Sequence, residues 1–362
     1  MGIFARKSPI IGLEIGEQNM VLAEIKRSGN TYEIMKFGIV PTPQGIMEGK
    51  MIVNEQGVIE TLKKLAQNAK VGSYRVALAV PGENTFVRNL VVPVMPESEL
   101  AEAVKIETEA QLPIPGKEVT VDFIKHNVII DGNSKKQEIL AVAVKNEVIS
   151  RMVRIVEAAG FRPVIMDIEP MVLHRAVKML NKSSIPEQGG LCLVNVGAGS
   201  TNISVFEQDQ LYFNRTLGFG YFKLSMSLVN QFNIPLETAE DEIAATDFEA
   251  VINRNEESVP NSRSQALILR VEGLASEIRR SVEYYISQHH GRQVSKVIIT
   301  GMGSKLKGMA PYMQNILELP VEIFNPAENL QISSEAKNME MDIVNTGVAL
   351  TQLVGLALSE AK

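Results

Sequence analysis

The sequence lacks the residue patterns on which several common kinds of active site depend. Its 362 residues include a single cysteine, Cys192, which excludes both a disulfide within the chain and a zinc site built from cysteines. The four histidines show no spacing with carboxylates that would place them around a metal ion. No Gly-x-Ser-x-Gly elbow is present, and Gln44 stands where a Walker A loop ending at Gly49-Lys50 needs its first glycine. Triad hydrolases and zinc enzymes are therefore poor interpretations.

Long apolar runs and an excess of positive charge are also missing. Lys and Arg number 36 against 42 Asp and Glu, a net charge of −6, so a nucleic-acid partner is not expected. No segment reaches the roughly 18 consecutive apolar residues of a membrane span. The apolar tail Ile343–Leu358 is interrupted by polar residues such as Gln352 and is predicted to be a buried helix. The length and the 45% hydrophobic content are sufficient for two folded domains.

A glycine-rich turn between two apolar runs is the most informative feature of the second half. The segment Leu191–Phe206 turns at Gly197-Ala198-Gly199-Ser200 and then alternates as a strand does. The glycines permit positive φ and leave no Cβ in the way, so backbone N–H groups can converge on an anion. Ser200, Thr201 and Asn202 add side-chain donors. The pattern predicts a phosphate-binding β-hairpin, although a purely structural hairpin has the same sequence appearance.

The N-terminal part of the chain repeats this pattern. Residues Ile10–Ala23 again form an apolar run, a glycine turn and a second apolar run. A repeat separated by half the chain predicts two related domains that each offer a hairpin to a shared cleft, an arrangement that suits a nucleoside triphosphate. A gap-free alignment of the two segments places Glu14 on Asn195, Gly16 on Gly197, and Asn19 on Ser200.

The segments between and after the hairpins complete the pattern. From about Phe86 to Asp167 the periodicities follow the order β-α-β-β-α-β, which predicts a compact inserted subdomain. The carboxylates of Asp167-Ile168-Glu169-Pro170 suit both capping of the next helix and orientation of an attacking or metal-bound water. A long amphipathic helix is predicted from Ala266 to about His290. The strand that follows it leads into Gly301-Met302-Gly303-Ser304, where the backbone can approach a ligand.

Together these pieces resemble the actin-like ATPase superfamily and, within it, the PilM-type proteins of type IV pilus assembly, which are related to FtsA. The segments that carry the resemblance are Leu90–Leu100, Lys105–Pro115 and Glu277–Tyr285. It implies an α/β, actin-like (ribonuclease H-like) two-domain ATPase fold with an inserted β-α-β-β-α-β subdomain. The implied boundaries are 1–86, 167–188 and 341–362 for the first domain, 87–166 for the inserted subdomain, and 189–340 for the second domain.

For the ligand, the resemblance implies ATP with Mg²⁺ in the cleft between the domains. Glu14 would hold the metal, directly or through water, and Glu14, Asp167 and Glu169 are the implied catalytic candidates. The residues implied at the nucleotide are Gly16, Gln18, Asn19, Asn195, Gly197, Gly199, Ser200, Thr201, Glu277, Arg280, Ser281, Gly301, Gly303 and Ser304.

The resemblance also implies partners at the inner membrane. They are the cytoplasmic N-terminal peptide of a PilN-like protein, other pilus components and a second copy of the chain. Nucleic acid is not expected as a partner. The peptide would lie in a groove bordered by the inserted subdomain, within Val87–Leu112. The protein itself would be cytoplasmic and peripheral to the membrane through its partner.

Two departures from the family pattern concern carboxylate positions of the implied nucleotide site, and a third concerns a lysine. Family members usually carry Asp where this chain has Glu14 and Asn195, and a Lys expected soon after Ala239-Glu240 is absent. Since phosphoryl transfer depends on positioned charge, binding is expected to survive better than turnover. The leading hypothesis is an ATP-binding scaffold with slow or no hydrolysis. The alternatives are an active ATPase or kinase, an FtsA-like filament protein, and a type II secretion component that keeps the fold without the nucleotide.

Overall fold

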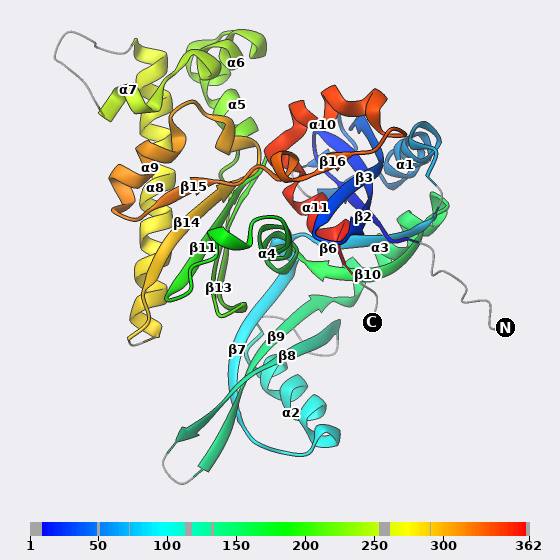
Figure 1. Ribbon diagram of the computed structural model, residues 1–362, viewed down its shortest axis with the longest axis vertical. Coiled ribbons are helices and arrows are strands. Elements are labelled where there is room, and N and C mark those ends of the chain that lie inside the picture. Colours follow the sequence, from blue (N-terminus) through cyan, green and yellow to red (C-terminus); the bar gives the residue numbers. More distant parts are fainter. Residues whose placement is uncertain are drawn as a thin grey trace.

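The computed structural model describes residues 9–48, 51–71, 73–112, 118–131, 134–252, 261–289 and 291–359. Its first sheet is built on an antiparallel meander of three strands, and the remaining strands join parallel to their neighbours (Figure 1). Across the sheet the strands are β10 (Arg162–Ile168), β6 (Arg75–Val80), β1 (Ile11–Ile15), β2 (Asn19–Ser28), β3 (Thr31–Pro41) and β16 (Gln331–Ile332).

The second sheet has the same plan. Its strands β11, β12 and β13 form an antiparallel meander, and β14 and β15 extend it in parallel from β11. The repeat predicted from the sequence is thus a repeat of whole sheets, with each glycine turn joining the first two strands of a meander. The strands are β13 (Gln210–Leu217), β12 (Thr201–Glu207), β11 (Gly190–Val196), β14 (Val294–Thr300) and β15 (Val321–Ile323).

Two helices, α4 (Glu169–Leu180) and α11 (Thr351–Ala357), lie between the two sheets (Figure 1). One apolar cluster joins them to both sheets, and it includes Leu173 of α4, Leu353 of α11, Val21 of β2 and Leu193 of β11. The helices approach closely because Gly355 has no side chain: a Cβ there would lie 2.0 Å from the Val172 carbonyl oxygen. The two halves of the molecule therefore share a packed core below the cleft.

Helices cover the outer faces of both sheets. On the first sheet, α1 (Glu55–Ala69) and α3 (Asn146–Ala158) pack against the same apolar cluster as β1 and β6. A short hairpin, β4 (Met47–Glu48) with β5 (Met51–Ile52), precedes α1. The helices of the second domain are α5 (Tyr221–Phe232), α6 (Leu236–Ala245), α7 (Phe248–Ile252), α8 (Ser262–Gln288) and α9 (Met309–Leu317).

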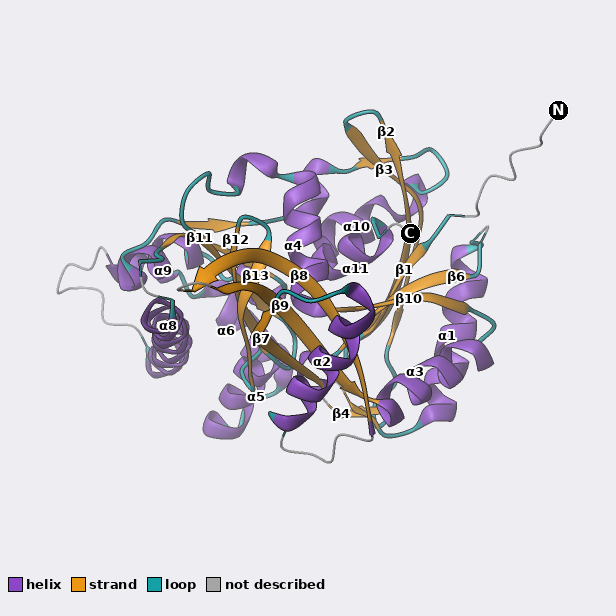
Figure 2. Cartoon of the chain, turned by 90° about the horizontal axis from the view of Figure 1, so that it is seen from below, coloured by secondary structure: helices purple, strands orange, loops and turns teal. Residues whose placement is uncertain are grey.

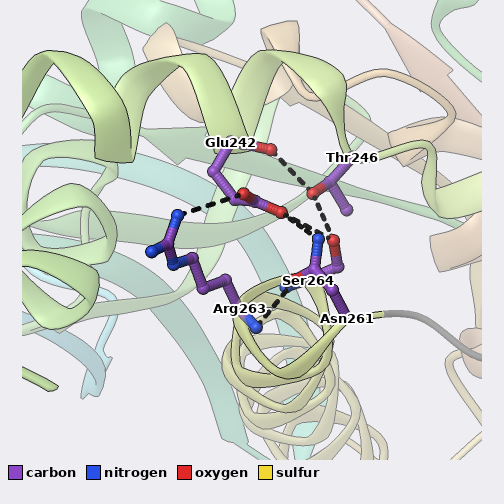
Figure 3. A network of polar contacts seen from close by, with 5 residues as sticks. All are labelled: Glu242, Thr246, Asn261, Arg263 and Ser264. Carbon is purple, nitrogen blue, oxygen red and sulfur yellow. Dashed lines mark hydrogen bonds and ion pairs between the residues drawn. The ribbon is translucent and has the colours of Figure 1, made fainter. Parts of the chain in front are cut away.

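The long helix α8 begins earlier than the apolar pattern predicted. Asn261 caps it, since its Oδ1 accepts hydrogen bonds from the N–H groups of Arg263 and Ser264, each at 2.9 Å (Figure 3). Asn261 Nδ2 and Ser264 Oγ also donate to Glu242 Oε1 at 2.8 and 3.0 Å, which ties the start of α8 to α6. The prediction of a start at Ala266 is therefore wrong, because a polar cap and not the first apolar residue sets the helix end. His290, its predicted end, lies outside the described residues.

The inserted unit contains β7 (Thr85–Pro93), α2 (Glu97–Ala110), β8 (Val119–Asp131) and β9 (Ser134–Lys145). Its strands form a separate sheet in the order β7-β9-β8, and α2 packs on one face through Leu100 and Val104 (Figures 1 and 2). The predicted element order is present, but β10 pairs with β6 of the first sheet and α3 packs there as well. We therefore propose that the inserted subdomain ends near Lys145 and not at residue 166.

The C-terminal segment also differs from its prediction. The chain returns to the first sheet at β16, before residue 341, because β16 pairs with β3. The apolar tail is not one helix: α10 (Glu340–Thr346) is followed by a 3-10 turn and then by α11. The break falls at Gly347, whose φ of 39° is incompatible with a continuous helix. In the part of the chain that the structure describes, no helix is long and apolar enough to span a membrane.

Candidate functional site

The two glycine hairpins have the same backbone geometry. In the first, the Gly16 N–H donates to the Asn19 carbonyl oxygen at 3.1 Å, and in the second, the Gly197 N–H donates to the Ser200 carbonyl oxygen at 2.9 Å. The strand register also matches, since Glu14 pairs with Val21 and Asn195 pairs with Asn202. The sequence alignment of the two segments therefore holds at the level of individual hydrogen bonds.

Close approach, and not positive φ, explains the glycines at Gly16 and Gly197. Gly16, Gly197 and Gly199 are absent from the glycines with positive φ. A Cβ on Gly16 would lie 2.6 Å from the Asn19 carbonyl oxygen, and one on Gly197 would lie 3.0 Å from that of Ser200. A side chain would therefore push the two sides of each turn apart.

Helix α5 orients the backbone of the second turn. The N–H groups of Tyr221 and Phe222 donate to the carbonyl oxygens of Gly197 and Ala198, both at 2.9 Å. In a trans peptide the C=O and N–H point in opposite directions, so the N–H groups of Ala198 and Gly199 point away from α5. None of the described residues accepts a hydrogen bond from either group. The turn therefore presents two backbone donors to its other side.

A side-chain donor lies beside these backbone groups. Ser200 is 4% exposed, and its Oγ has no hydrogen-bond partner among the described residues. Leaving a buried hydroxyl without a partner costs about 1–3 kcal/mol, so such a group is usually completed by water or a ligand. The second hairpin thus offers three donors, which is the chemistry of an anion site.

Two cavities meet at the hairpins. The larger, of about 220 Å³, is lined by Glu14–Glu17 and Gly197–Gly199, with an apolar wall that includes Leu78 and Met152. The smaller, of about 100 Å³, is lined by Gly16, Gln18 and Asn19 of the first hairpin and by Gly301 and Met302 after β14. Glu14, Asn195 and Gln352 line both. The fold therefore collects residues from segments far apart in the sequence around the two hairpins.

Asn195 connects the second hairpin to the linking helix α4. Its Nδ2 donates to Glu169 Oε1 at 2.9 Å, and Glu169 is 1% exposed at the first residue of α4. Gly301 lies against the other side of the same amide: its φ is 83°, and a Cβ there would lie 2.3 Å from Asn195 Oδ1. Both ends of the Asn195 side chain are therefore fixed by neighbours.

The chain matches the family of type IV pilus assembly protein PilM over residues 12–361. It belongs to this family. A structure of the PilM-PilN type IV pilus biogenesis complex is similar to it with a TM-score of 0.79 and 25% identity, covering 97% of this chain and 98% of that chain. These matches confirm the predicted family and the actin-like two-domain α/β fold.

Two further proteins are similar to this chain at lower identity. Cell division protein FtsA of Bacillus subtilis (strain 168) is 22% identical over 351 residues, which cover 87% of this chain and 78% of FtsA. The crystal structure of MreB 5 of Spiroplasma citri bound to AMPPNP has a TM-score of 0.49 and 13% identity, and covers 94% of this chain and 98% of that chain.

Some residues predicted at the nucleotide are buried just behind the two cavities of this PilM family member. Thr201 Oγ1 donates to the Phe219 carbonyl oxygen at 2.9 Å, and Ser304 Oγ donates to that of Gly301 at 2.7 Å. Gly303 packs against Val196, whose Cγ1 would lie 2.2 Å from a Cβ at that position. These residues shape the turns, and Thr201 and Ser304 already have partners within the chain.

Other predicted residues do not line the two cavities. Asp167 Oδ2 accepts a hydrogen bond from Arg175 at 2.6 Å, as expected for a structural carboxylate. Glu277 on α8 pairs with Arg215 at 3.1 Å and with Arg280 at 2.6 Å, and Ser281 Oγ donates to the Glu277 carbonyl oxygen at 2.8 Å. Glu169 also lines neither cavity, but it accepts a hydrogen bond from Asn195, which lines both.

Several cavity residues were missed by the sequence reasoning. Gln352 of α11 and Thr346 of α10 line the smaller cavity, while Asn84 and Arg151 line the larger. A signal for the first two was present, because they interrupt an otherwise apolar tail. Asn84 and Arg151 lie outside any motif, and only the fold brings them to the hairpins.

The residues present fit a phosphate group better than a cation held by protein alone. The second hairpin supplies the N–H groups of Ala198 and Gly199 and the hydroxyl of Ser200 as donors. Within the described residues no group of three or more His, Cys, Asp or Glu side chains could hold a metal ion. A Mg²⁺ ion at Glu14 would therefore take the rest of its oxygen shell from phosphate and water, as this ion commonly does.

Proposed function

We propose that this protein is a cytoplasmic ATP-binding scaffold of type IV pilus assembly, held at the inner membrane by a PilN-like partner. The proposal of nucleotide binding rests on the pair of facing hairpins. The first bears carboxylates, and the second has backbone N–H groups that no described residue accepts a hydrogen bond from. ATP placed between them would bind both domains at once and fix their relative orientation. The likeness to a PilM-PilN complex supports the partner.

Each hairpin has a separate task in this proposal. The N–H groups of Ala198 and Gly199 and the hydroxyl of Ser200 bind phosphate oxygens. Glu14 holds Mg²⁺ through water, and the ion neutralises phosphate charge when it is bound. Hydrolysis is slow or absent because two of the three candidate carboxylates are engaged elsewhere: Glu169 accepts from Asn195, and Asp167 accepts from Arg175.

The partner peptide is proposed to lie along the base of the inserted subdomain. A groove of about 390 Å³ runs there between the start of β7 and the end of β13, and it is lined by Val87, Arg88, Asn214, Arg215 and others. Both apolar and polar side chains border it. Other pilus inner-membrane components and a second copy of the chain are further proposed partners.

A substitution in the second hairpin tests the nucleotide proposal. Gly199→Val places a branched side chain on the donor turn and is expected to weaken ATP binding at least 100-fold in calorimetric titration. Gly273→Ala on α8 is the matched control, since nothing lies within 4 Å of a Cβ there. Unchanged affinity in Gly199→Val would remove the hairpin from the binding site. Rapid phosphate release by the wild type would instead favour an active ATPase, and ATP-dependent polymers would favour an FtsA-like filament protein.

A further inference from the structure

Among the aligned positions at which the two hairpins differ, one difference has a structural cause. Where the first hairpin carries the carboxylate of Glu14, the second carries the amide of Asn195. The second hairpin has the buried end of α4 against it, with Asn195 Nδ2 at 2.9 Å from Glu169 Oε1. An amide donates to a carboxylate, whereas a second carboxylate at this distance would repel it.

The surroundings of Glu169 leave its buried side chain little freedom to move. Glu169 is the first residue of α4, where the helix dipole stabilises negative charge. Its Oε2 lies on the side of Gly82, 3.7 Å from the position of a Cβ on that residue. Asn195 cannot turn away, because Gly301 packs against its Oδ1. The contact is therefore a fixed link between α4 and β11 at the floor of the cleft.

A buried carboxylate requires a partner, and there are two ordinary ways to supply one. A hydrogen-bond donor from the protein is one, and a cation shared with neighbouring oxygens is the other. We infer that Asn195 is a positioning residue that takes the place of a divalent cation between β11 and α4. It holds Glu169 in the closed floor of the cleft without an ion. The functional meaning of this inference rests on the proposed nucleotide site.

The inference predicts that one substitution creates a cation requirement. In Asn195→Asp the new carboxylate faces Glu169, and Glu14 lies on the same cavity. In EDTA and without nucleotide, we expect Tm to fall by about 4–8 °C relative to the wild type. Millimolar MgCl₂ should restore most of this loss in Asn195→Asp and change the wild type by less than about 1 °C.

Two further variants separate this link from general damage. In Asn195→Asp/Glu169→Gln the hydrogen bond can form in the opposite sense, so Tm should recover in EDTA and lose its dependence on Mg²⁺. Asn230→Asp changes an exposed asparagine of α5 in the same way and should show neither effect.

Three results would overturn the inference. The first is an Asn195→Asp variant whose Tm in EDTA equals that of the wild type. The second is a fall in Tm that neither Mg²⁺ nor Glu169→Gln reverses. The third is a wild type whose Tm rises with Mg²⁺ as much as that of Asn195→Asp does. Because no nucleotide is present, a failure of ATP binding would contradict the proposed function and leave this test unaffected.

Discussion

The two hairpins of the cleft share a backbone but differ in what holds them and in what they present. The first is held by the end of β3, where the Thr42 hydroxyl and N–H donate to the carbonyl oxygens of Gly16 and Gln18 at 2.7 and 2.8 Å. The second is held by the start of α5. The first presents the carboxylate of Glu14, and the second presents N–H groups and the Ser200 hydroxyl. The two sides of the cleft therefore share one backbone frame but carry different chemical groups.

The largest expected effect concerns the packing behind the second hairpin. Gly301→Ala should lower the free energy of unfolding by about 3 kcal/mol or more, because its Cβ would meet Asn195 Oδ1 at 2.3 Å. Gly291→Ala has nearly the same φ, 82° against 83°, but nothing within 4 Å, and should cost only about 1 kcal/mol. Urea unfolding measures both. Equal losses would mean that backbone strain alone, and not contact with Asn195, makes Gly301 necessary.

Acid should weaken the packing of α4 against the second sheet. His174 is buried and stacks on Phe206 of β12 with ring centroids 4.1 Å apart. Burial lowers the pKa of His174 to about 4. Because the unfolded chain binds the proton more tightly, this stabilisation is complete above about pH 6.5 and is lost as the pH falls toward 4.

The loss should reach about 2 kcal/mol at pH 5. Urea unfolding of wild type and His174→Gln at pH 7 and 5 measures it, and the variant should show a smaller fall. An equal fall in both proteins would place the acid sensitivity elsewhere.

The proposed role of Glu14 in binding Mg²⁺ can be tested by removing its charge. Glu14→Gln should weaken binding of ATP about tenfold in the presence of Mg²⁺ and leave binding in EDTA no weaker, because the change removes a negative charge from the phosphate site. Titrations under both conditions measure this. A loss of equal size in EDTA would show that Glu14 contacts the nucleotide itself and not the ion.

The proposed role of Ser200 in phosphate binding can be tested against its neighbour Thr201 at the start of β12. Ser200→Ala removes a buried hydroxyl without a partner, so stability should hold or rise slightly while ATP affinity falls about fivefold. Thr201→Val removes a hydroxyl that donates to Phe219, so it should cost about 1 kcal/mol of stability instead. Thermal unfolding and ATP titration of both variants separate the roles. A stability loss in Ser200→Ala would mean that its hydroxyl has a structural partner.

The sequence was informative where the determinants are local. Glycine turns between apolar runs predicted both hairpins, and their alignment predicted two related domains. It failed where a partner far along the chain decides the structure. Nothing within Arg162–Ile168 indicates that this strand pairs with β6 and leaves the inserted sheet. Likewise, Glu277 belongs to a segment that carries the family resemblance, yet its ion pair with Arg215 forms outside both cavities.

The central claim is that the two hairpins hold ATP without turning it over rapidly. The most direct measurement is a titration of the full chain with ATP and Mg²⁺, followed by a phosphate-release assay on the same sample. We predict one bound ATP per chain and release far slower than dissociation of the nucleotide. An absence of binding, or release at many turnovers per minute, would contradict the account.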